Sequence, residues 1–311
     1  MKIKKIEVFP IRVKNNFDIG RKSDTKNINT AMLEIKNLKK TKKEAPAKNK
    51  VEKRNLEPKS LGNYETNIKD MGEYYVDEGS ATSIYSKSHE TTVVKIETEN
   101  GIVGWGEAQS PVSPNTTATI IKDIVEPLTI GKDIYDVESI WHNNYSSKRE
   151  RGHYTGFYID AICGVDIAIW DAIGKSLNMP TCKAMGGAHR KSVALYNGIG
   201  GTEPEEVADQ AEWSVGKGYK FVKMHLKENL EKDIEIARKV RERVGDSIGI
   251  MIDVHMGFDT FNVIKLGKEL EKLNLLWIES PSDPTDIPGL CEISRSLDIP
   301  IANGEWTRTK Y

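Results

Sequence analysis

Three carboxylates stand at one fixed interval along the chain, each close behind a short apolar run. Asp253, Glu279 and Glu305 follow one another in steps of 26 residues. Each apolar run has the length of a buried strand, and the stretch between two runs has a helical pattern. A repeated strand–helix unit with an acid at the carboxyl end of the strand is typical of a β/α barrel, which builds its active site at that end. The pattern therefore predicts an α/β fold with three oxygen donors suited to Mg²⁺ at a barrel mouth.

The overall composition argues against several classes of protein. The 311 residues are enough for two domains, and their formal net charge of −1 gives no electrostatic reason to bind nucleic acid or an acidic membrane. No apolar run approaches the roughly 20 residues that span a bilayer, and the charged start is unlike a signal peptide. The 3 cysteines are widely spaced and form no zinc or redox motif. Their pattern favours reduced thiols, and so a cytoplasmic location.

The first part of the chain has an α+β pattern. Alternating polar and apolar residues predict a strand over 3–13, and the turn at Asn100-Gly101 predicts a hairpin formed by 91–99 and 102–108. Helical patterns follow at about 116–128, 134–146 and 155–177. Two glycine-rich stretches, 104–106 and 198–201, lack a phosphate-loop motif and are interpreted as turns.

A strongly basic segment separates the first two predicted strands. Residues 36–60 contain ten Lys or Arg and three Asp or Glu, with few large apolar side chains. Such a segment buries too little apolar surface to offset the entropy of ordering it. We interpret it as a mobile insertion, with a functional basic arm as the alternative.

From residue 192 onward, strand and helix patterns alternate. The predicted strands are 192–196, 219–225 and the three runs behind which the acids stand; the predicted helices are 203–216, 230–244, 261–273 and 286–296. These are five strands, and at about 27 residues a unit, three more units would need on the order of 80 further residues to complete a barrel of eight. The sequence thus predicts an incomplete barrel, as in a chain truncated at its C-terminal end.

Two basic side chains and a histidine are in phase with the acids. Because side chains alternate along a strand, Lys223 shares a face with His225, and Asp253 shares a face with His255. Taken singly, an acid behind a strand is often a helix N-cap, and a lone lysine or histidine is often a solvated loop residue. The common spacing and phase favour a site, in which the acids bind a hard cation and leave positions open for a substrate's oxygens.

A longer motif carries a resemblance to a known family. Residues 161–175, Ala-Ile-Cys-Gly-Val-Asp-Ile-Ala-Ile-Trp-Asp-Ala-Ile-Gly-Lys, are followed by Pro180 and by Met185-Gly186-Gly187. This text resembles the signature helix of the mandelate racemase/muconate lactonizing enzyme branch of the enolase superfamily, and residues 102–107 resemble the second hairpin strand of that branch. The resemblance covers residues 1–14 and about 90–311 and leaves out the basic insertion.

The resemblance implies a fold, a metal and a chemical step. It implies an α+β capping domain, here 1–187, and an enolase-type β/α barrel domain, here 188–311 and partial. Asp253, Glu279 and Glu305 fall on the three Mg²⁺-ligand positions, and Lys223 falls on the first lysine of a Lys-x-Lys motif. The shared step removes a proton α to a carboxylate, and Mg²⁺ stabilises the charge that develops.

Two departures from the family pattern narrow the expected reaction. His225 stands where the second lysine would be, which exchanges a reference pKa near 10.4 for one near 6.5. His255 follows Asp253 in an Asp-x-His arrangement similar to that of sugar-acid dehydratases, in which such a histidine does acid–base work. These features indicate dehydration of an aldonic-type sugar acid to a 2-keto-3-deoxy acid. Lys223 would stabilise negative charge, one of the two histidines would be the base, and the other could be the acid.

Alternative functions remain open at this point. One is a non-catalytic fragment or pseudoenzyme that at most binds metal, and another is a racemase or cycloisomerase of the same family. In each case the expected ligand is a small-molecule carboxylate rather than a nucleic acid or membrane, and a homo-oligomer is compatible with the family. Which sugar acid is bound does not follow from these residues.

Overall fold

The computed structural model describes residues 1–14, 68–78, 82–226, 229–305 and 307–309. Contacts divide the chain into two units, Met1–Asn15 with Glu65–Tyr311, and Asn16–Tyr64. The second unit, and with it the basic insertion predicted at 36–60, lies outside the described residues. Among the helices that are described, none is long and apolar enough to cross a membrane. The first unit contains two separate hydrophobic cores.

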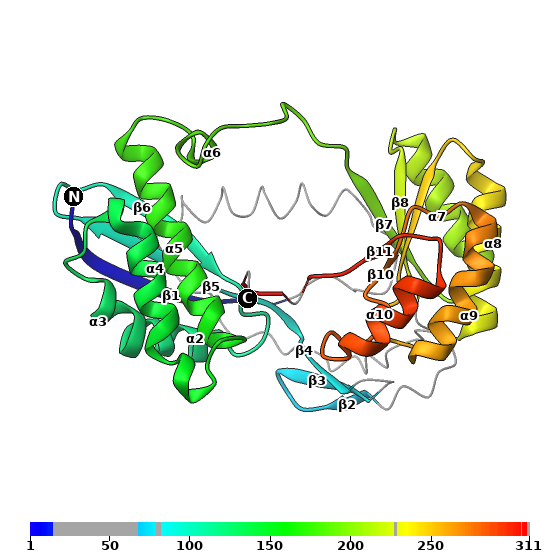
Figure 1. Cartoon of the computed structure of the whole chain (residues 1–311), viewed down its shortest axis with the longest axis horizontal. Coiled ribbons are helices and arrows are strands. Elements are labelled where there is room, and N and C mark those ends of the chain that lie inside the picture. The colour runs from blue at the N-terminus through cyan, green and yellow to red at the C-terminus, as the bar shows by residue number, and fades with distance from the viewer. Residues whose placement is uncertain (15–67, 79–81, 227–228, 306, 310–311) are drawn as a thin grey trace, which may run out of the picture. The chain divides into compact units, whose positions relative to one another are not determined.

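The N-terminal core lies between an antiparallel sheet and the helices on one of its faces (Figure 1). The sheet order is β1-β5-β6, with β1 at Ile3–Lys14, β5 at Ser88–Thr98 and β6 at Val103–Ala108. The helical segments are α2 (Pro114–Ile120), a π-helical turn (Ile121–Val125), α3 (Glu126–Thr129), α4 (Val137–Ser147), α5 (Phe157–Ser176) and α6 (Thr181–Ala184). Alternate residues of β5, among them Val94 and Ile96, are fully buried in this core, as expected for a sheet with one covered face.

Strand β6 lies against α5 so closely that only glycine fits at two positions. A Cβ atom added at Gly104 would lie 2.0 Å from the Ala168 carbonyl oxygen, and one at Gly106 would lie 2.1 Å from that of Gly164. The interpretation of 104–106 as a turn is therefore wrong, because these residues are strand residues that allow close packing. The 198–201 stretch is likewise mostly strand, since Gly198 and Gly200 belong to β7 (Tyr196–Gly200).

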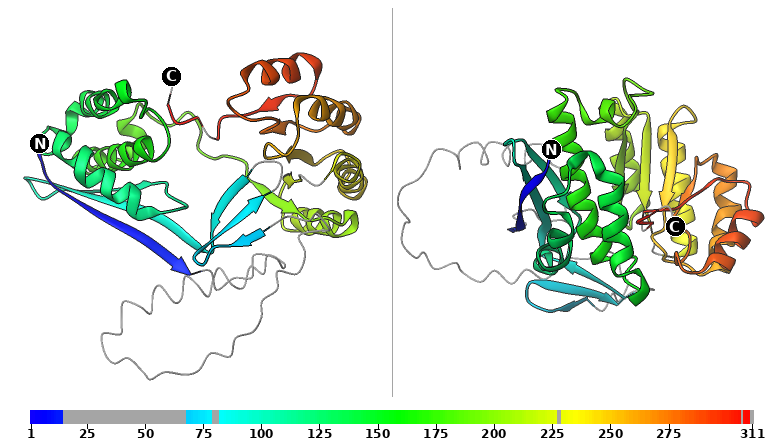
Figure 2. Two further views of the ribbon diagram at one scale, coloured as in Figure 1. Left: turned by 90° about the horizontal axis from the view of Figure 1, so that it is seen from below. Right: turned by 60° about the vertical axis from the view of Figure 1, so that its left-hand side comes forward.

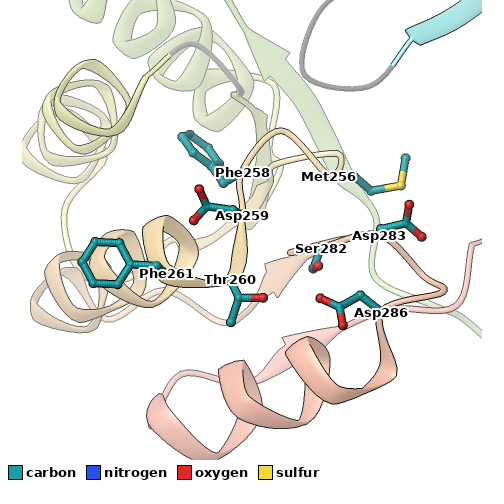
Figure 3. A pocket seen from close by; sticks show the side chains of 8 residues that line it. All are labelled: Met256, Phe258, Asp259, Thr260, Phe261, Ser282, Asp283 and Asp286. Atoms are coloured by element: carbon teal, nitrogen blue, oxygen red, sulfur yellow. The ribbon is translucent and has the colours of Figure 1, made fainter.

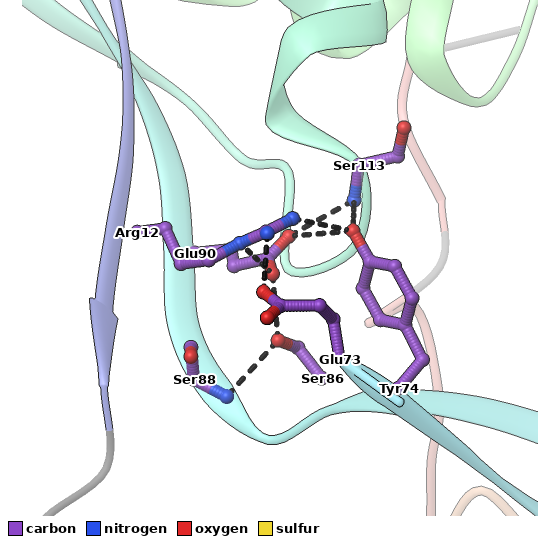
Figure 4. A network of polar contacts seen from close by, with 7 residues as sticks. All are labelled: Arg12, Glu73, Tyr74, Ser86, Ser88, Glu90 and Ser113. Atoms are coloured by element: carbon purple, nitrogen blue, oxygen red, sulfur yellow. Dashed lines mark hydrogen bonds and ion pairs between the residues drawn. The ribbon is translucent and has the colours of Figure 1, made fainter. Parts of the chain in front are cut away.

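A second antiparallel sheet, which the sequence reading missed, precedes β5. It consists of β2 (Ile68–Asp70), β3 (Tyr74–Glu78) and β4 (Thr82–Ser86) in that order. Figure 4 shows how polar side chains connect it to β1 and β5. The Glu90 side chain is 0% exposed and pairs with Arg12 Nε at 2.7 Å. It also accepts from the Ser86 hydroxyl at 2.7 Å and from the Ser113 backbone N–H at 3.0 Å. Protein donors thus replace the water that this buried carboxylate has lost.

The C-terminal core lies between a parallel sheet and helices on one of its faces (Figures 1 and 2). The strand order β11-β10-β9-β8-β7 follows the chain, which is the order of successive β/α units in a barrel. The strands are β7, β8 (Phe221–His225), β9 (Gly249–Asp253), β10 (Ile278–Glu279) and β11 (Ile301–Ala302), and the helices are α7 (Pro204–Gly216), α8 (Leu230–Val244), α9 (Thr260–Leu270) and α10 (Ile287–Ser296).

The α/β fold predicted from the sequence is confirmed, with five parallel strands and an α+β part before them. One strand is displaced, since the first strand of the parallel sheet is 196–200 rather than 192–196. Alternation explains the sheet's two faces: Val222, Met224 and Ile250 face the helices and are fully buried, whereas Lys223, His225 and Asp253 face the other way. The domain boundary at 187/188 stays a prediction.

Candidate active site

The candidate site lies at the carboxyl ends of neighbouring parallel strands. In the register of the sheet, His225 of β8 stands opposite Asp253 of β9, and Asp253 stands opposite Glu279 of β10. Because these residues occupy equivalent places on adjacent strands, their side chains leave the sheet on the same face. The fold therefore brings together Lys223, His225, Asp253 and Glu279, and His255 lies close enough for its charge to act on His225.

The ammonium group of Lys223 lies between the two acids. Its Nζ donates to Glu279 Oε1 at 2.9 Å and to Asp253 Oδ2 at 3.4 Å. The lysine side chain is 8% exposed and that of Asp253 is 4% exposed, so the pair is shielded from water. The ring of Tyr196 lies over the same ammonium, 5.3 Å from it to the ring centroid, an additional favourable contact for a cation.

These contacts keep Lys223 protonated. Burial alone would lower the pKa of Lys223, but the hydrogen bond to Glu279 and the attraction of both carboxylates outweigh it, so the pKa is raised above its ordinary value. A lysine in this state is a poor base. It serves instead as a fixed positive charge and hydrogen-bond donor.

The pKa of His225 is shifted in the opposite direction, below its ordinary value. Desolvation lowers its pKa, and the attraction of Asp253 does not fully compensate, with Lys223 adding repulsion. Its Nδ1 lies 3.5 Å from Asp253 Oδ2, and its side chain is 54% exposed. A histidine held neutral near neutral pH, with part of its ring open to solvent, can accept a proton.

Hydrogen bonds from their own strand ends orient the two acids. Asp253 Oδ1 accepts from the backbone N–H of His255 at 2.9 Å. Glu279 Oε2 accepts from the indole Nε1 of Trp277 at 3.1 Å, while its other oxygen faces Lys223. Sequence reasoning missed Tyr196 and Trp277, although the two-residue spacing of Trp277 from Glu279 is the kind that places side chains on one side of an extended chain.

The backbone just beyond the acids adopts an unusual conformation. His255, Met256 and Ser280 have φ angles of 44°, 60° and 47°. None is glycine, so each lies in a region that is costly for an L-residue. The segment is stabilised by the Met256 N–H, which donates to the Ser280 carbonyl at 2.8 Å. Such strain clusters at functional sites, and His255 is one of the three residues that carry it here.

Glu305 is placed differently from the other two acids. It lies in an exposed turn beyond β11, and its backbone carbonyl accepts from Arg308 at 3.2 Å. Among the described residues, no group of three or more His, Cys, Asp and Glu side chains is close enough to hold a metal ion. The predicted convergence of three acids is thus seen for Asp253 and Glu279 but not for Glu305.

The two converging acids nevertheless fit a cation. Oxygens of Asp253 and Glu279 point at one positively charged atom, Lys223 Nζ. Carboxylate oxygens are the donors that Mg²⁺ prefers, and an acidic pair that already faces an ammonium has the chemistry to face a metal ion. The donor set is therefore compatible with Mg²⁺ at these two residues.

Two family models match the chain, one in each half. Residues 77–186 match the mandelate racemase/muconate lactonizing enzyme N-terminal domain, and residues 206–311 match a domain described as enolase C-terminal domain-like.

Curated relatives have several activities. An arabinonate dehydratase of Saccharolobus solfataricus is 30% identical over 226 residues, which are 71% of this chain and 60% of that protein. An L-talarate/galactarate dehydratase of Salmonella typhimurium is 35% identical, over 59% of this chain and 46% of the relative. An N-succinyl-L-Arg/Lys racemase of Bacillus cereus is 31% identical, over 67% of this chain and 56% of the relative. The chain thus spans about half to three fifths of the length of these relatives.

Solved structures lead to the same family. A protein of Sinorhizobium meliloti superposes with a TM-score of 0.78 at 29% identity, covering 98% of this chain and 69% of that one. The 3,6-anhydro-D-galactonate cycloisomerase of Zobellia galactanivorans superposes with a TM-score of 0.64 at 26% identity, covering 77% of this chain and 65% of that one. With both halves matched by family models and the acids at the strand ends, the chain belongs to the mandelate racemase/muconate lactonizing enzyme branch of the enolase superfamily.

Proposed function

We propose that the protein to which this chain belongs is a Mg²⁺-dependent dehydratase of an aldonic-type sugar acid. The observation that carries the proposal is the arrangement at the strand ends: the protonated Lys223 lies against Asp253 and Glu279, with His225 opposite Asp253. This set can bind a substrate carboxylate, stabilise its charge and accept a proton next to it. Two of the curated relatives are named as sugar-acid dehydratases, which supports this choice of substrate class.

Each residue has a role that follows from its charge state. Bound Mg²⁺, held by Asp253 and Glu279 with Glu305 as the third proposed ligand, would supply positive charge to the substrate carboxylate. Lys223 donates a hydrogen bond to the oxygens on which negative charge develops. His225, whose pKa is lowered, takes the α-proton. His255 then donates a proton to the departing β-hydroxyl group, so that water leaves and a 2-keto-3-deoxy acid remains.

The same site suits other reactions of the family. Relatives include a racemase and a D-galactarolactone cycloisomerase, the latter 29% identical over 70% of this chain. Both activities begin with α-proton removal, so Lys223 and His225 would keep their roles. A racemase would return the proton to the other face of the α-carbon, and solvent deuterium would enter that carbon without loss of water.

Screening a panel of aldonic and aldaric acids with Mg²⁺ tests the proposal. The expected result is formation of a 2-keto acid that disappears in EDTA and in the His225→Asn variant. Because the chain spans 60% of the arabinonate dehydratase, the 311-residue chain is compared with a chimera that adds the remaining barrel strands of that relative. Entry of solvent deuterium at the α-carbon without loss of water would favour a racemase or cycloisomerase over a dehydratase. Absence of both turnover and exchange in the two proteins would leave a non-catalytic member of the family.

A further inference from the structure

A pocket outside the proposed catalytic site lies between two loops that follow β9 and β10 (Figure 3). Its volume is about 480 Å³, and its lining is Met256, Phe258, Asp259, Thr260, Phe261, Ser282, Asp283 and Asp286. Figure 3 shows side chains from both loops around one space, with Ser282, Thr260 and Asp286 turned toward it. The lining contains three carboxylates and no Lys, Arg or His, so the pocket has a strongly negative potential.

Ser282 adds a neutral hydrogen-bonding group to the lining of the pocket. The residue is only 5% exposed, and it lines the pocket. Its hydroxyl has no hydrogen-bond partner among the residues that the structure describes. The small exposed part of this otherwise buried residue therefore offers its hydroxyl to a ligand in the pocket, as donor or acceptor.

The acids retain free acceptor atoms after their structural roles are counted. Asp286 begins α10, where its Oδ1 accepts from the Gly289 N–H at 3.0 Å. Asp283 Oδ1 accepts from both the backbone and the hydroxyl of Thr285. In the described part of the chain, the second oxygen of each of these two acids has no such bond. Asp259 differs, because its two oxygens accept from the backbone and side chain of Asn262.

The charge of the pocket selects a cation over an anion. The first N–H groups of α9 and α10 would otherwise attract an anion. Here Asp259 and Asp286 already occupy these groups, and a third acid adds repulsion. Hydrogen bonds from Thr285 lower the pKa of Asp283, which keeps this exposed carboxyl ionised.

The dimensions of the pocket select an organic cation over a metal ion. Among the described residues, no three potential ligand side chains are close enough to hold a metal. A pocket of about 480 Å³ accommodates a molecule of several heavy atoms. Met256 and Phe258 supply an apolar wall for an aliphatic stem, and an aromatic face attracts a cationic head group.

We propose that this pocket binds an organic cation, with a primary ammonium or guanidinium group on a short aliphatic stem. Asp283, Asp286 and Ser282 accept its N–H donors, and Met256 and Phe258 contact the stem. The cation is either a free amine or the side chain of a lysine or arginine in a peptide. The proposal depends only on the pocket and holds whatever reaction the site at Asp253 and Glu279 performs.

Calorimetric titration of the 311-residue chain at low salt tests the proposal. The ligands are agmatine, n-pentylammonium, neutral n-pentanol and an acetylated, amidated Gly-Gly-Arg-Gly-Gly peptide. Saturable binding of either amine, at least tenfold tighter than n-pentanol, supports a free cation as the ligand. Binding of the peptide alone supports a protein side chain. Failure of all three cations to bind, or equal binding of the neutral alcohol, overturns the proposal.

Substitutions locate the site. Asp283→Asn keeps the oxygen that accepts from Thr285, and Asp286→Asn keeps the oxygen that caps α10. Both remove the charge, and each is expected to weaken binding about tenfold or more. Ser282→Ala is expected to weaken it severalfold. Glu231→Gln, which removes an exposed carboxylate in the first turn of α8, is the matched control and leaves binding unchanged. Circular dichroism verifies that each variant is folded. If Asp286→Asn unfolds, the Asp283→Asn and Ser282→Ala variants still test the proposal. Unchanged affinity for the cation in both of these variants overturns it.

Discussion

Lys223 Nζ lies closer to Glu279 Oε1, at 2.9 Å, than to Asp253 Oδ2, at 3.4 Å, yet it lies within reach of both. One buried ammonium thus balances two carboxylates on adjacent strands. A metal ion bound by the same acids would compete with the lysine for their oxygens or share them with it. This relationship gives a measurable link between the lysine, the acids and Mg²⁺ that does not depend on turnover.

We expect Lys223→Met to make the stability of the chain depend on Mg²⁺. Without the ammonium, Asp253 and Glu279 face each other with little water, and loss of one partner of a buried pair costs about 3 kcal/mol. Mg²⁺ would replace the missing positive charge and recover much of that loss. Urea unfolding with 10 mM Mg²⁺, with Ca²⁺ and with EDTA, compared with wild type, measures the effect.

The matched control is Lys95→Met. Lys95 pairs with Glu7 at 2.8 Å on the N-terminal sheet, where the lysine side chain is 24% exposed. Its loss is expected to change stability little and to produce no response to Mg²⁺. If the two variants respond equally to Mg²⁺, or neither responds, Asp253 and Glu279 do not bind the metal as proposed.

We expect Asp166→Asn to stabilise the protein at neutral pH. Burial raises the pKa of Asp166 to about 6, with Glu138 adding repulsion. Since the folded pKa is higher than the unfolded one, the folded state binds more protons between about pH 4 and 6. Stability contributed by this group is therefore present at low pH and is lost as pH rises through 6. The asparagine amide does not ionise, so the variant avoids this loss. Its free energy of unfolding is expected to exceed that of wild type by about 1–2 kcal/mol at pH 7.5, and the difference should disappear toward pH 4.

Asp171→Asn on the same helix is the control with the opposite sign. Asp171 accepts from the Trp105 backbone N–H at 2.8 Å and pairs with Lys175 at 2.6 Å. Loss of its charge is expected to destabilise the protein at pH 7.5. Chemical unfolding from pH 4.5 to 8 separates the two cases, and a pH-independent effect of Asp166→Asn would contradict the assignment of a raised pKa.

The regular parts of the fold could be predicted because local pattern and tertiary burial agree. The 230–244 helix was predicted to the residue, since its apolar stripe faces the sheet and Asn229 caps it. Tertiary contacts decided the rest. The placement of β7 at 196–200 depends on pairing with β8, and the sheet of β2–β4 depends on Glu90, Arg12 and Ser113, which are distant in sequence.

The sequence predicted the site residues that lie on regular strands but not the placement of those beyond them. Strand alternation placed Lys223, His225 and Asp253 on one face, and this is what the register shows. No periodicity could place Glu305, which follows a two-residue strand and lies in a turn. The two-residue spacing of Trp277 from Glu279 could have placed the indole near the acid, but the hydrogen bond between them depends on side-chain rotamers, which spacing does not determine.

We expect Glu90 and Arg12 to be strongly coupled. Glu90 Oε1 lies 2.7 Å from Arg12 Nε, and the carboxylate is wholly buried. Glu90→Gln removes the charge that Arg12 faces, and Arg12→Met leaves the buried carboxylate without its cation, so each is expected to destabilise the protein. The double variant should cost less than the sum by about 1–3 kcal/mol. Strict additivity in urea unfolding would show that the two side chains contribute independently.

We expect Gly106→Ala to disrupt the N-terminal core. The added Cβ would lie 2.1 Å from the Gly164 carbonyl and 2.7 Å from the Ala168 backbone nitrogen, and neither atom can move without shifting α5 away from the sheet. Overpacking of this kind typically costs about 1–3 kcal/mol, and more where backbone must move. Gly216→Ala at the end of α7 is the control, because a Cβ there meets nothing within 4 Å and alanine favours the helix by about 1 kcal/mol. The melting temperature should therefore fall for Gly106→Ala and rise for Gly216→Ala. A Gly106→Ala protein as stable as wild type would show that β6 and α5 do not pack as closely as these distances indicate.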